Sequence, residues 1–274
     1  MNISAIKNYF NNFRGITLNQ EILHHLKIQK EQEVLQNNQV ATKEIWCLEQ
    51  VFKIIDEYLL AFNNLRDKKH FDAWCAFERA EIGISSLKKH LNFDDNKYNL
   101  EFYDRVIYQY QKLFPYEYFF SRESVIKKSS CSICGQPMSL RNPCGHKVGE
   151  IYNGEQCLRK IEDMKLLAIA VVKNPFDKYA VLFPQDMEYN YAILDNLMDQ
   201  ISGPYDDWRL EVVKEKRKEY IGVGRNKLCP CNSGRKYKFC CLNTDSELFD
   251  HYRIFFHTDS PKKNIPMQLI HTWK

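Results

Sequence analysis

The chain has 274 residues, of which 44% are hydrophobic and 27% are charged. This composition is typical of a globular protein, and the length predicts about two domains. A net charge of +4 is too small to indicate nucleic-acid binding by itself. The longest apolar run, Leu166 to Val172, has seven residues, whereas a membrane helix needs about 18. The N-terminus lacks the pattern of a signal peptide, so we expect a cytoplasmic protein that does not enter a membrane.

Residues 1–125 predict a helical domain, because Gly15, Gly83 and Pro115 are its only glycines and prolines. Apolar residues recur every three or four positions between Val40 and Leu65, which indicates one buried helix face. Helices are expected at 5–13, 19–36, 40–65, 70–91 and 100–114, with the third and fourth packed antiparallel.

The following region predicts a small mixed domain, residues 126–204. Two β-branched or aromatic runs, 168–173 and 179–183, flank Asn174-Pro175 and predict a β-hairpin. A helix is expected at 189–201. A second, highly charged helix at 206–220 would form a spacer over residues 205–221.

Ten cysteines carry the main chemical signal. In a reducing cytoplasm, clustered cysteines are typical of metal sites rather than disulfides. Cys47 and Cys75 stand alone within helical patterns and are expected in the core. The other eight fall into two short clusters, where seven of the ten glycines also gather.

The C-terminal cluster places Cys229-Pro-Cys231 eight residues before Cys240-Cys241. Four thiolates can surround Zn²⁺ tetrahedrally and close its coordination shell, which is typical of a structural site. The surrounding module, residues 222–242, is too short to fold on a hydrophobic core, so a metal has to stabilise it. A redox role for the adjacent pair Cys240 and Cys241 is the competing interpretation.

The segment GRNKLCPCNSGRKYKFCC, residues 224–241, resembles the SEC-C motif found at the C-terminus of the translocase motor SecA. It departs from the usual pattern at Lys227-Leu228, where Asp-Pro is common, and at Asn232, where Gly is common; none of these positions is a ligand. The resemblance implies a zinc module that docks on other macromolecules, since the SecA tail contacts a chaperone and the ribosome. It does not imply a translocase, because the chain has no GxxxxGK[ST] phosphate-binding loop.

The module is basic and contains aromatic residues. Tyr237 and Phe239 lie among five cationic side chains that could contact phosphates, with base stacking on the rings. An alternative is a solvated basic surface whose aromatic rings pack beneath the metal. The five candidate partner-binding residues are Arg225, Lys227, Arg235, Lys236 and Lys238.

The central cluster begins with Cys131-Ser-Ile-Cys134-Gly, a zinc knuckle. Asn153 and Gln156 suggest a capped helix that would hold Cys157 in its first turn, where the helix dipole favours a thiolate. A knuckle followed by a ligand at a helix start predicts a treble-clef-like finger. The expected ligands are Cys131, Cys134, His146 and Cys157, with Cys144 as the alternative to His146.

Residues 131–183 also resemble a group of uncharacterised bacterial zinc-binding proteins. The shared residues include CSICG, then C-x-H, then Gly149, Tyr152, Gly154 and a segment like VKNPFDKYAVLF. This resemblance implies the zinc site and no particular activity.

Residues 243–274 form a C-terminal extension whose aromatic content predicts packing on the body. His251 and His257 within it are expected to be ordinary packing or surface residues. The predicted fold is therefore mainly α with small α+β zinc modules: a helical bundle, a central finger with its hairpin, and the C-terminal SEC-C module.

Three functions compete. The leading hypothesis is a non-enzymatic protein with two Zn²⁺ ions that docks on a protein, ribosome or nucleic acid and has no small-molecule substrate. A zinc hydrolase using His146 with Glu150 or Glu155 would need an open coordination site, yet enough cysteines are present to close it. The third is a partner-specific interaction protein, in stress or phage defence, whose helical half makes the contact.

Overall fold

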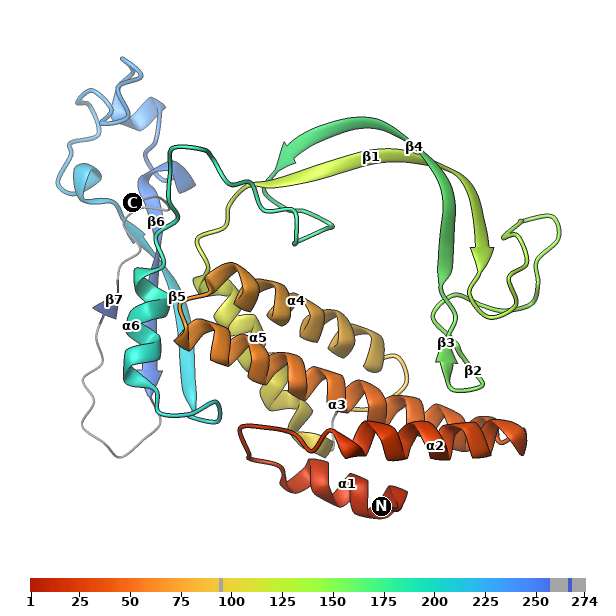
Figure 1. Cartoon of the computed structure of the whole chain (residues 1–274). Coiled ribbons are helices and arrows are strands. Elements are labelled where there is room, and N and C mark those ends of the chain that lie inside the picture. The colour runs from red at the N-terminus through yellow and green to blue at the C-terminus, as the bar shows by residue number, and fades with distance from the viewer. Residues whose placement is uncertain (94–95, 257–265, 268–274) are drawn as a thin grey trace.

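The structure, a computed structural model, describes residues 1–93, 96–256 and 266–267. The fold is mixed α/β, with six α-helices and small antiparallel sheets in the described part of the chain (Figure 1). The first five helices lie at or near the five segments where helices were expected. Their bounds are α1 (Ile3–Asn12), α2 (Glu21–Leu35), α3 (Gln39–Arg66), α4 (His70–Leu87) and α5 (Leu100–Leu113), the last preceded by the 3-10 turn η1 (Lys97–Asn99).

Helix α3 is the centre of this domain and is buried along most of its length. Asn38 caps its start by accepting a hydrogen bond from the Ala41 N–H (3.2 Å). Aromatic rings from α4 and α5 meet beside it, with Phe77 and Tyr110 stacked at 5.0 Å between centroids. Cys47 is buried in this core and Cys75 packs against it, as expected for small apolar residues. Burial raises the pKa of the Cys47 thiol to about 11, which keeps it neutral.

A long two-stranded ribbon arches over the helices, and its far end returns to them (Figure 1). It pairs β1 (Phe119–Cys131) with β4 (Arg159–Val172) in antiparallel register, interrupted by three irregularities. Such bulges increase local twist and bend a strand, in keeping with the arched shape. The expected domain boundary at residue 125 falls inside β1.

The predicted hairpin of 168–173 with 179–183 is wrong. The first segment is the end of β4 and pairs with β1. The second runs along the other edge of β1, where the Phe120 N–H donates to the Ala180 carbonyl (2.7 Å). Both segments are extended, as predicted. They do not pair with each other, because each forms hydrogen bonds with an opposite edge of β1, which lies between them.

The second half of the chain adds α6 (Ala192–Gln200), which confirms the helix expected there, and a three-stranded sheet. The sheet consists of β5 (Trp208–Lys216), β6 (Leu248–Phe256) and β7 (Pro266–Met267), in the order β5-β6-β7. The predicted helical spacer at 206–220 is therefore wrong. Trp208 buries its ring against Tyr110 of α5, and Gln109 accepts from the Leu210 N–H (2.7 Å), so this segment docks as a strand.

Strand β6 confirms that part of the C-terminal extension packs back on the body. Ile254 is buried in the main core, and Tyr252 and Phe256 pack against it. His251 is buried too, with its Nδ1 3.8 Å from a Glu215 carboxylate oxygen. His257 and Trp273 lie outside the described residues.

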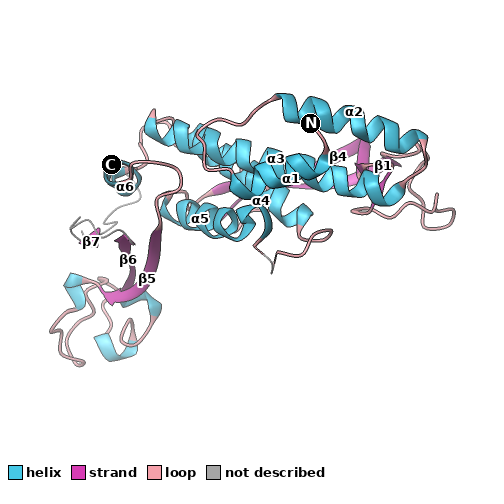
Figure 2. Ribbon diagram, turned by 90° about the horizontal axis from the view of Figure 1, so that it is seen from below, coloured by secondary structure: helices cyan, strands magenta, loops and turns pink. Residues whose placement is uncertain are grey.

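Both cysteine clusters occupy the connection at the end of a two-stranded ribbon. The central cluster lies between β1 and β4, together with the short strands β2 (Ile151–Tyr152) and β3 (Glu155–Gln156). The C-terminal module connects β5 to β6 through three 3-10 turns, η2 (Lys218–Tyr220), η3 (Tyr237–Phe239) and η4 (Asp245–Glu247) (Figure 2). None of the helices in the described ranges combines the length and the apolar content that crossing a membrane requires.

Candidate metal centres

The four C-terminal cysteines converge on one point. The Sγ atoms of Cys229, Cys231, Cys240 and Cys241 all lie within 4.8 Å of one another. The Sγ of Cys240 is 3.4 Å from that of Cys231 and 3.7 Å from that of Cys241. Sulfur ligands about 2.3 Å from a tetrahedral zinc would be about 3.8 Å apart, so this cluster has the size of a zinc site.

Backbone pairing brings the two halves of this cluster together. The Cys229 N–H donates to the Arg235 carbonyl (2.8 Å), and the Tyr237 N–H donates to the Lys227 carbonyl (2.8 Å). The turn between them passes through Asn232 (φ 59°) and Gly234 (φ 73°). Asparagine is one of the few side chains that tolerate this left-handed region, which explains how it can replace the usual glycine of the motif.

The thiols differ in electrostatic environment. Hydrogen bonds from Ser233 and from neighbouring thiols lower the pKa of Cys231 to about 6. Tyr220 donates to Cys241 and lowers its pKa, but burial and three neighbouring cysteines outweigh that bond and raise the pKa to about 12. The surroundings thus favour the thiolate at Cys231 and the neutral thiol at Cys241, whose proton a bound metal would have to displace.

A buried polar network fixes the module to the β5–β6 ribbon. Tyr237 is almost completely buried and donates its hydroxyl hydrogen to the Glu247 carboxylate. Lys216 of β5 donates to the Tyr237 hydroxyl (3.0 Å) and lies 3.4 Å from the same carboxylate. The Asn243 N–H supplies a further bond to Glu247 (3.1 Å). Sequence reasoning missed Glu247 and Lys216, because their role depends on the pairing of β5 with β6.

The expected basic residues lie on the outside of the module. Arg225, Lys227, Arg235 and Lys236 are exposed, and Lys238 is half-buried with its ammonium 4.8 Å from the centre of the Phe239 ring. Of the two aromatic residues, Tyr237 packs beneath the cluster, whereas Phe239 is 69% exposed. Leu228 is similarly exposed at 70%. The surface therefore combines cations with two apolar side chains.

Comparison with known proteins agrees with this geometry. Residues 225–243 match the SEC-C motif family. This chain carries a SEC-C module. Among curated proteins, the protein translocase subunit SecA of Clostridium acetobutylicum is 54% identical over 41 residues, which is 15% of this chain. The shared segment covers 4% of that SecA, so this chain spans only a small part of the length of that relative. No solved structure matches the chain.

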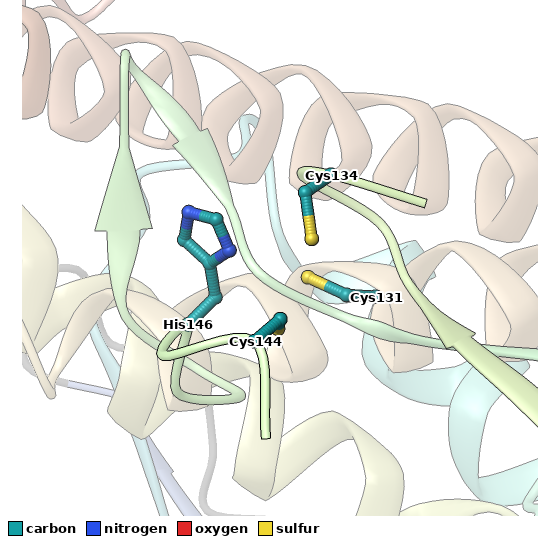
Figure 3. A group of neighbouring side chains, drawn as sticks. All are labelled: Cys131, Cys134, Cys144 and His146. Atoms are coloured by element: carbon teal, nitrogen blue, oxygen red, sulfur yellow. The ribbon is translucent and has the colours of Figure 1, made fainter. Parts of the chain in front are cut away.

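The central cluster is similarly compact. The ligand atoms of Cys131, Cys134, Cys144 and His146 all lie within 4.8 Å of one another (Figure 3). The knuckle is a tight turn in which the Gly135 N–H donates to the Cys131 carbonyl (2.9 Å), with Gly135 at φ 73°. Hydrogen bonds from the Cys134 and Ile133 N–H groups lower the pKa of Cys131 to about 6, against the effect of burial.

Cys157 is also at this cluster, but not for the reason predicted from the sequence. The expected capped helix is absent: residues 151–156 form the β2–β3 hairpin, whose turn is Asn153-Gly154 at φ 51° and 71°. Asn-Gly is the typical two-residue hairpin turn, and this signal overrides the capping pattern. Cys157 therefore has no helix dipole beside it, and the treble-clef arrangement is not confirmed. Its Sγ is 3.7 Å from that of Cys131, and burial raises its pKa to about 11.

His146 shows a feature typical of a ligand. Its Nδ1 is buried and has no hydrogen-bond partner among the residues that the structure describes. The ring stands edge-on to Tyr152, with 4.6 Å between centroids. A buried ring nitrogen without a partner costs free energy, which a bound metal or a neighbouring thiol would offset. The sequence offered Cys144 and His146 as alternatives, but the structure brings both to the cluster. With Cys157, five donors lie near one site.

The β2–β3 turn packs against α2 and α3 and so connects the central cluster to the helices. A Cβ at Gly154 would lie 2.5 Å from the Lys30 side chain and 3.2 Å from the Thr42 carbonyl oxygen, so the turn has no room for a larger residue. Lys30 bonds both Glu49 and Glu155 (2.8 Å each). Glu155, one of the bases considered for an enzyme, is thus held in an ion pair with α2.

Proposed function

We propose that the chain is a non-enzymatic, cytoplasmic protein that binds two Zn²⁺ ions and uses its SEC-C module to dock on a macromolecular partner. The donor chemistry supports zinc, because thiolate and imidazole at tetrahedral separations suit this ion better than Mg²⁺ or Ca²⁺. Cys229, Cys231, Cys240 and Cys241 would hold one ion. The second would take Cys131, Cys134, Cys144 and His146, the four donors whose mutual distances are compatible with one tetrahedron.

One observation carries the docking role. The module is held at the far end of the β5–β6 ribbon, with its basic side chains and Phe239 exposed to solvent. A rigid, metal-closed tip with exposed cations and apolar side chains is suited to binding an acidic surface such as a ribosome, RNA or acidic protein face. The two closed coordination shells also support a structural rather than a catalytic role for zinc.

The test measures co-sedimentation of the full-length protein with ribosomes or total RNA at two salt concentrations. Changing Arg235→Glu together with Lys236→Glu should lower co-sedimentation at least about tenfold, while zinc content stays unchanged. The variant with Cys229→Ser and Cys231→Ser should lose the C-terminal zinc and the co-sedimentation together, because the metal orders the tip.

A matched control applies the same change of charge elsewhere. Lys127→Glu with Lys160→Glu alters two exposed residues of the β1–β4 ribbon and should leave co-sedimentation unchanged. Equal losses in both charge-reversal variants would indicate nonspecific attraction, and unchanged binding of the cysteine variant would refute the docking role of the module.

A further inference from the structure

One face of the β1–β4 ribbon is apolar and exposed. Side chains at alternate positions of a strand share a face, so Phe120, Arg122, Ser124 and Ile126 of β1 lie together. Their register partners on β4 are Val171, Ile169, Leu166 and Met164. We call these eight residues the apolar ribbon face. Its six large apolar side chains are 40% to 60% exposed: Phe120, Ile126, Met164, Leu166, Ile169 and Val171.

The opposite face differs in composition. There, Ser121 faces Ala170, Glu123 faces Ala168, and Val125 faces Lys165. The ribbon is therefore amphipathic, with its apolar side in solvent among the described residues. A two-stranded ribbon is marginally stable in water unless its apolar face packs on something, and an exposed patch of this size on a monomer indicates an interaction site.

The apolar ribbon face carries both a protrusion and a hollow. Phe176, in the loop after β4, has a fully exposed side chain. This ring forms one edge of a hollow of about 190 Å³, whose other lining residues include Phe120, Met164 and Leu166. A surface that carries a protruding ring next to a hollow of side-chain size can be complementary to itself under a two-fold rotation.

The charges of the apolar ribbon face also allow two copies of it to pack together. Arg122 is the charged member of the eight residues, and its guanidinium pairs with Asp177 of its own chain (3.3 Å). Two such faces can meet without burying an unpaired charge, which would otherwise oppose association.

The area suits a weak dimer. Half-exposed side chains of this size contribute on the order of 100 Å² each, so seven per face, with Phe176 included, bury roughly 1,400 Å² between two faces, in the lower part of the range of specific interfaces. We propose that the occupant of the apolar ribbon face is the same face of a second copy of this chain, forming a two-fold, four-stranded sandwich with the sheets about 10 Å apart.

Sedimentation velocity of the zinc-loaded, full-length protein between about 1 and 100 μM tests this proposal, since a weak interface gives a micromolar Kd. The mass should rise from 32.7 kDa towards twice that value with concentration. Leu166→Thr with Ile169→Thr, and separately Phe176→Ser, should each raise the Kd at least about tenfold. Threonine is a β-branched residue that strands favour, and zinc content with circular dichroism will verify folding.

The matched control is Val125→Thr, a half-exposed apolar residue on the opposite face, and it should dimerise like the unmodified chain. A chain that stays at 32.7 kDa over the whole range refutes the proposal and leaves the face to a different partner. A dimer that the Leu166, Ile169 and Phe176 changes do not weaken, or that Val125→Thr weakens equally, refutes it as well.

Discussion

At the scale of single residues, the two clusters differ in how many donors they gather. The C-terminal cluster has four thiols for four tetrahedral positions. The central one has Cys144 and His146 in the compact group and Cys157 3.7 Å from Cys131. We expect Cys157→Ala to keep the central zinc, because Cys131, Cys134, Cys144 and His146 can close the shell without it. Cys144→Ala should weaken zinc binding by 100-fold or more, because losing a direct ligand costs more than losing a partner that only orients a ligand, which typically costs about 10–100-fold.

Cobalt substitution tests whether Cys157 is a ligand of the central site. The sulfur-to-cobalt charge-transfer absorption of the central site should match three thiolates in both the unmodified chain and Cys157→Ala. If the unmodified chain instead gave the spectrum of four thiolates and Cys157→Ala lost intensity, Cys157 would be a ligand. His146 would then lie beside the site without binding the metal.

Asn232 allows a second test at this scale. It occupies the left-handed region at φ 59°, where the motif usually has glycine. We expect Asn232→Gly to leave zinc affinity nearly unchanged. Asn232→Val should weaken it about 5- to 30-fold, because a β-branched residue in this region costs about 1–2 kcal/mol. Competition with a chromophoric chelator gives both values. The control is Lys227→Val, an exposed position in the backbone pairing that closes the same turn. An equal loss of zinc affinity in this variant would show that the backbone conformation of Asn232 is not the cause.

At the scale of elements, the base of the β1–β4 ribbon is fixed to α4 by the segment around Lys178. The Trp74 Nε1–H donates to the Lys178 carbonyl (2.7 Å), and the Lys178 ammonium bonds Glu81 and lies 3.2 Å from Glu78. The Glu78 side chain is 7% exposed, and burial raises its pKa despite the attraction of Lys178. Lys178→Met should therefore lower the free energy of unfolding by about 1–3 kcal/mol at pH 7, since it leaves a buried carboxylate without its cation.

The pH dependence of this loss follows from the direction of the Glu78 shift. An acid with a raised pKa binds its proton more tightly in the folded state, so it destabilises the fold once the pH rises through that pKa. The cost of Lys178→Met should thus be largest at pH 7 and shrink towards pH 5, as measured by thermal unfolding. Lys173→Met, which removes an exposed ion pair with Glu117, should cost less than about 0.5 kcal/mol. A pH-independent loss for Lys178→Met would contradict the role assigned to Glu78.

Sequence patterns predicted the helices much better than the strands. The helix between Val40 and Leu65 could be predicted from that segment alone, because every residue needed to identify its buried face lies within it. For β5, the sequence RLEVVKEK supports a charged helix as well as a strand. Its conformation is decided by β6, more than 30 residues away, and by Gln109 of α5. Local propensity cannot include a partner so distant along the chain.

The sites show the same limit. Ligand spacing was sufficient to predict both clusters, since cysteines close in sequence meet in a tight turn. The environment of Cys157 was not predicted correctly, because an Asn-Gly turn competed with a capping pattern over the same few residues. Glu247 and Lys216, which fix Tyr237, meet through the pairing of β5 with β6, and no local motif marks them.

At the scale of the whole molecule, the two cysteine clusters, each able to hold a metal ion, lie at the ends of the β1–β4 and β5–β6 strand pairs, while the main hydrophobic core lies in the helices. The central cluster contacts the helices through a few side chains: Gln39 with Asn153, Ser86 with Gln156, His90 with the Gly149 carbonyl, Lys30 with Glu155, and Ile151 against the main core. The free energy that orders residues 131–158 should therefore come mainly from the metal, whereas α3 and α4 are stabilised by apolar burial.

Removing zinc from the full-length protein with a chelator should accordingly have a local effect. Hydrogen exchange followed by mass spectrometry should show amides of residues 131–158 and 222–243 exchanging at least about 100-fold faster, because their opening no longer breaks metal bonds. Amides of α3 and α4 should keep their protection, since Tyr58 and Phe77 remain buried in the core. If α3 and α4 lost protection to the same extent, metal binding and helix packing would form one cooperative unit. If neither segment changed, the hairpin contacts alone would be holding the clusters in place.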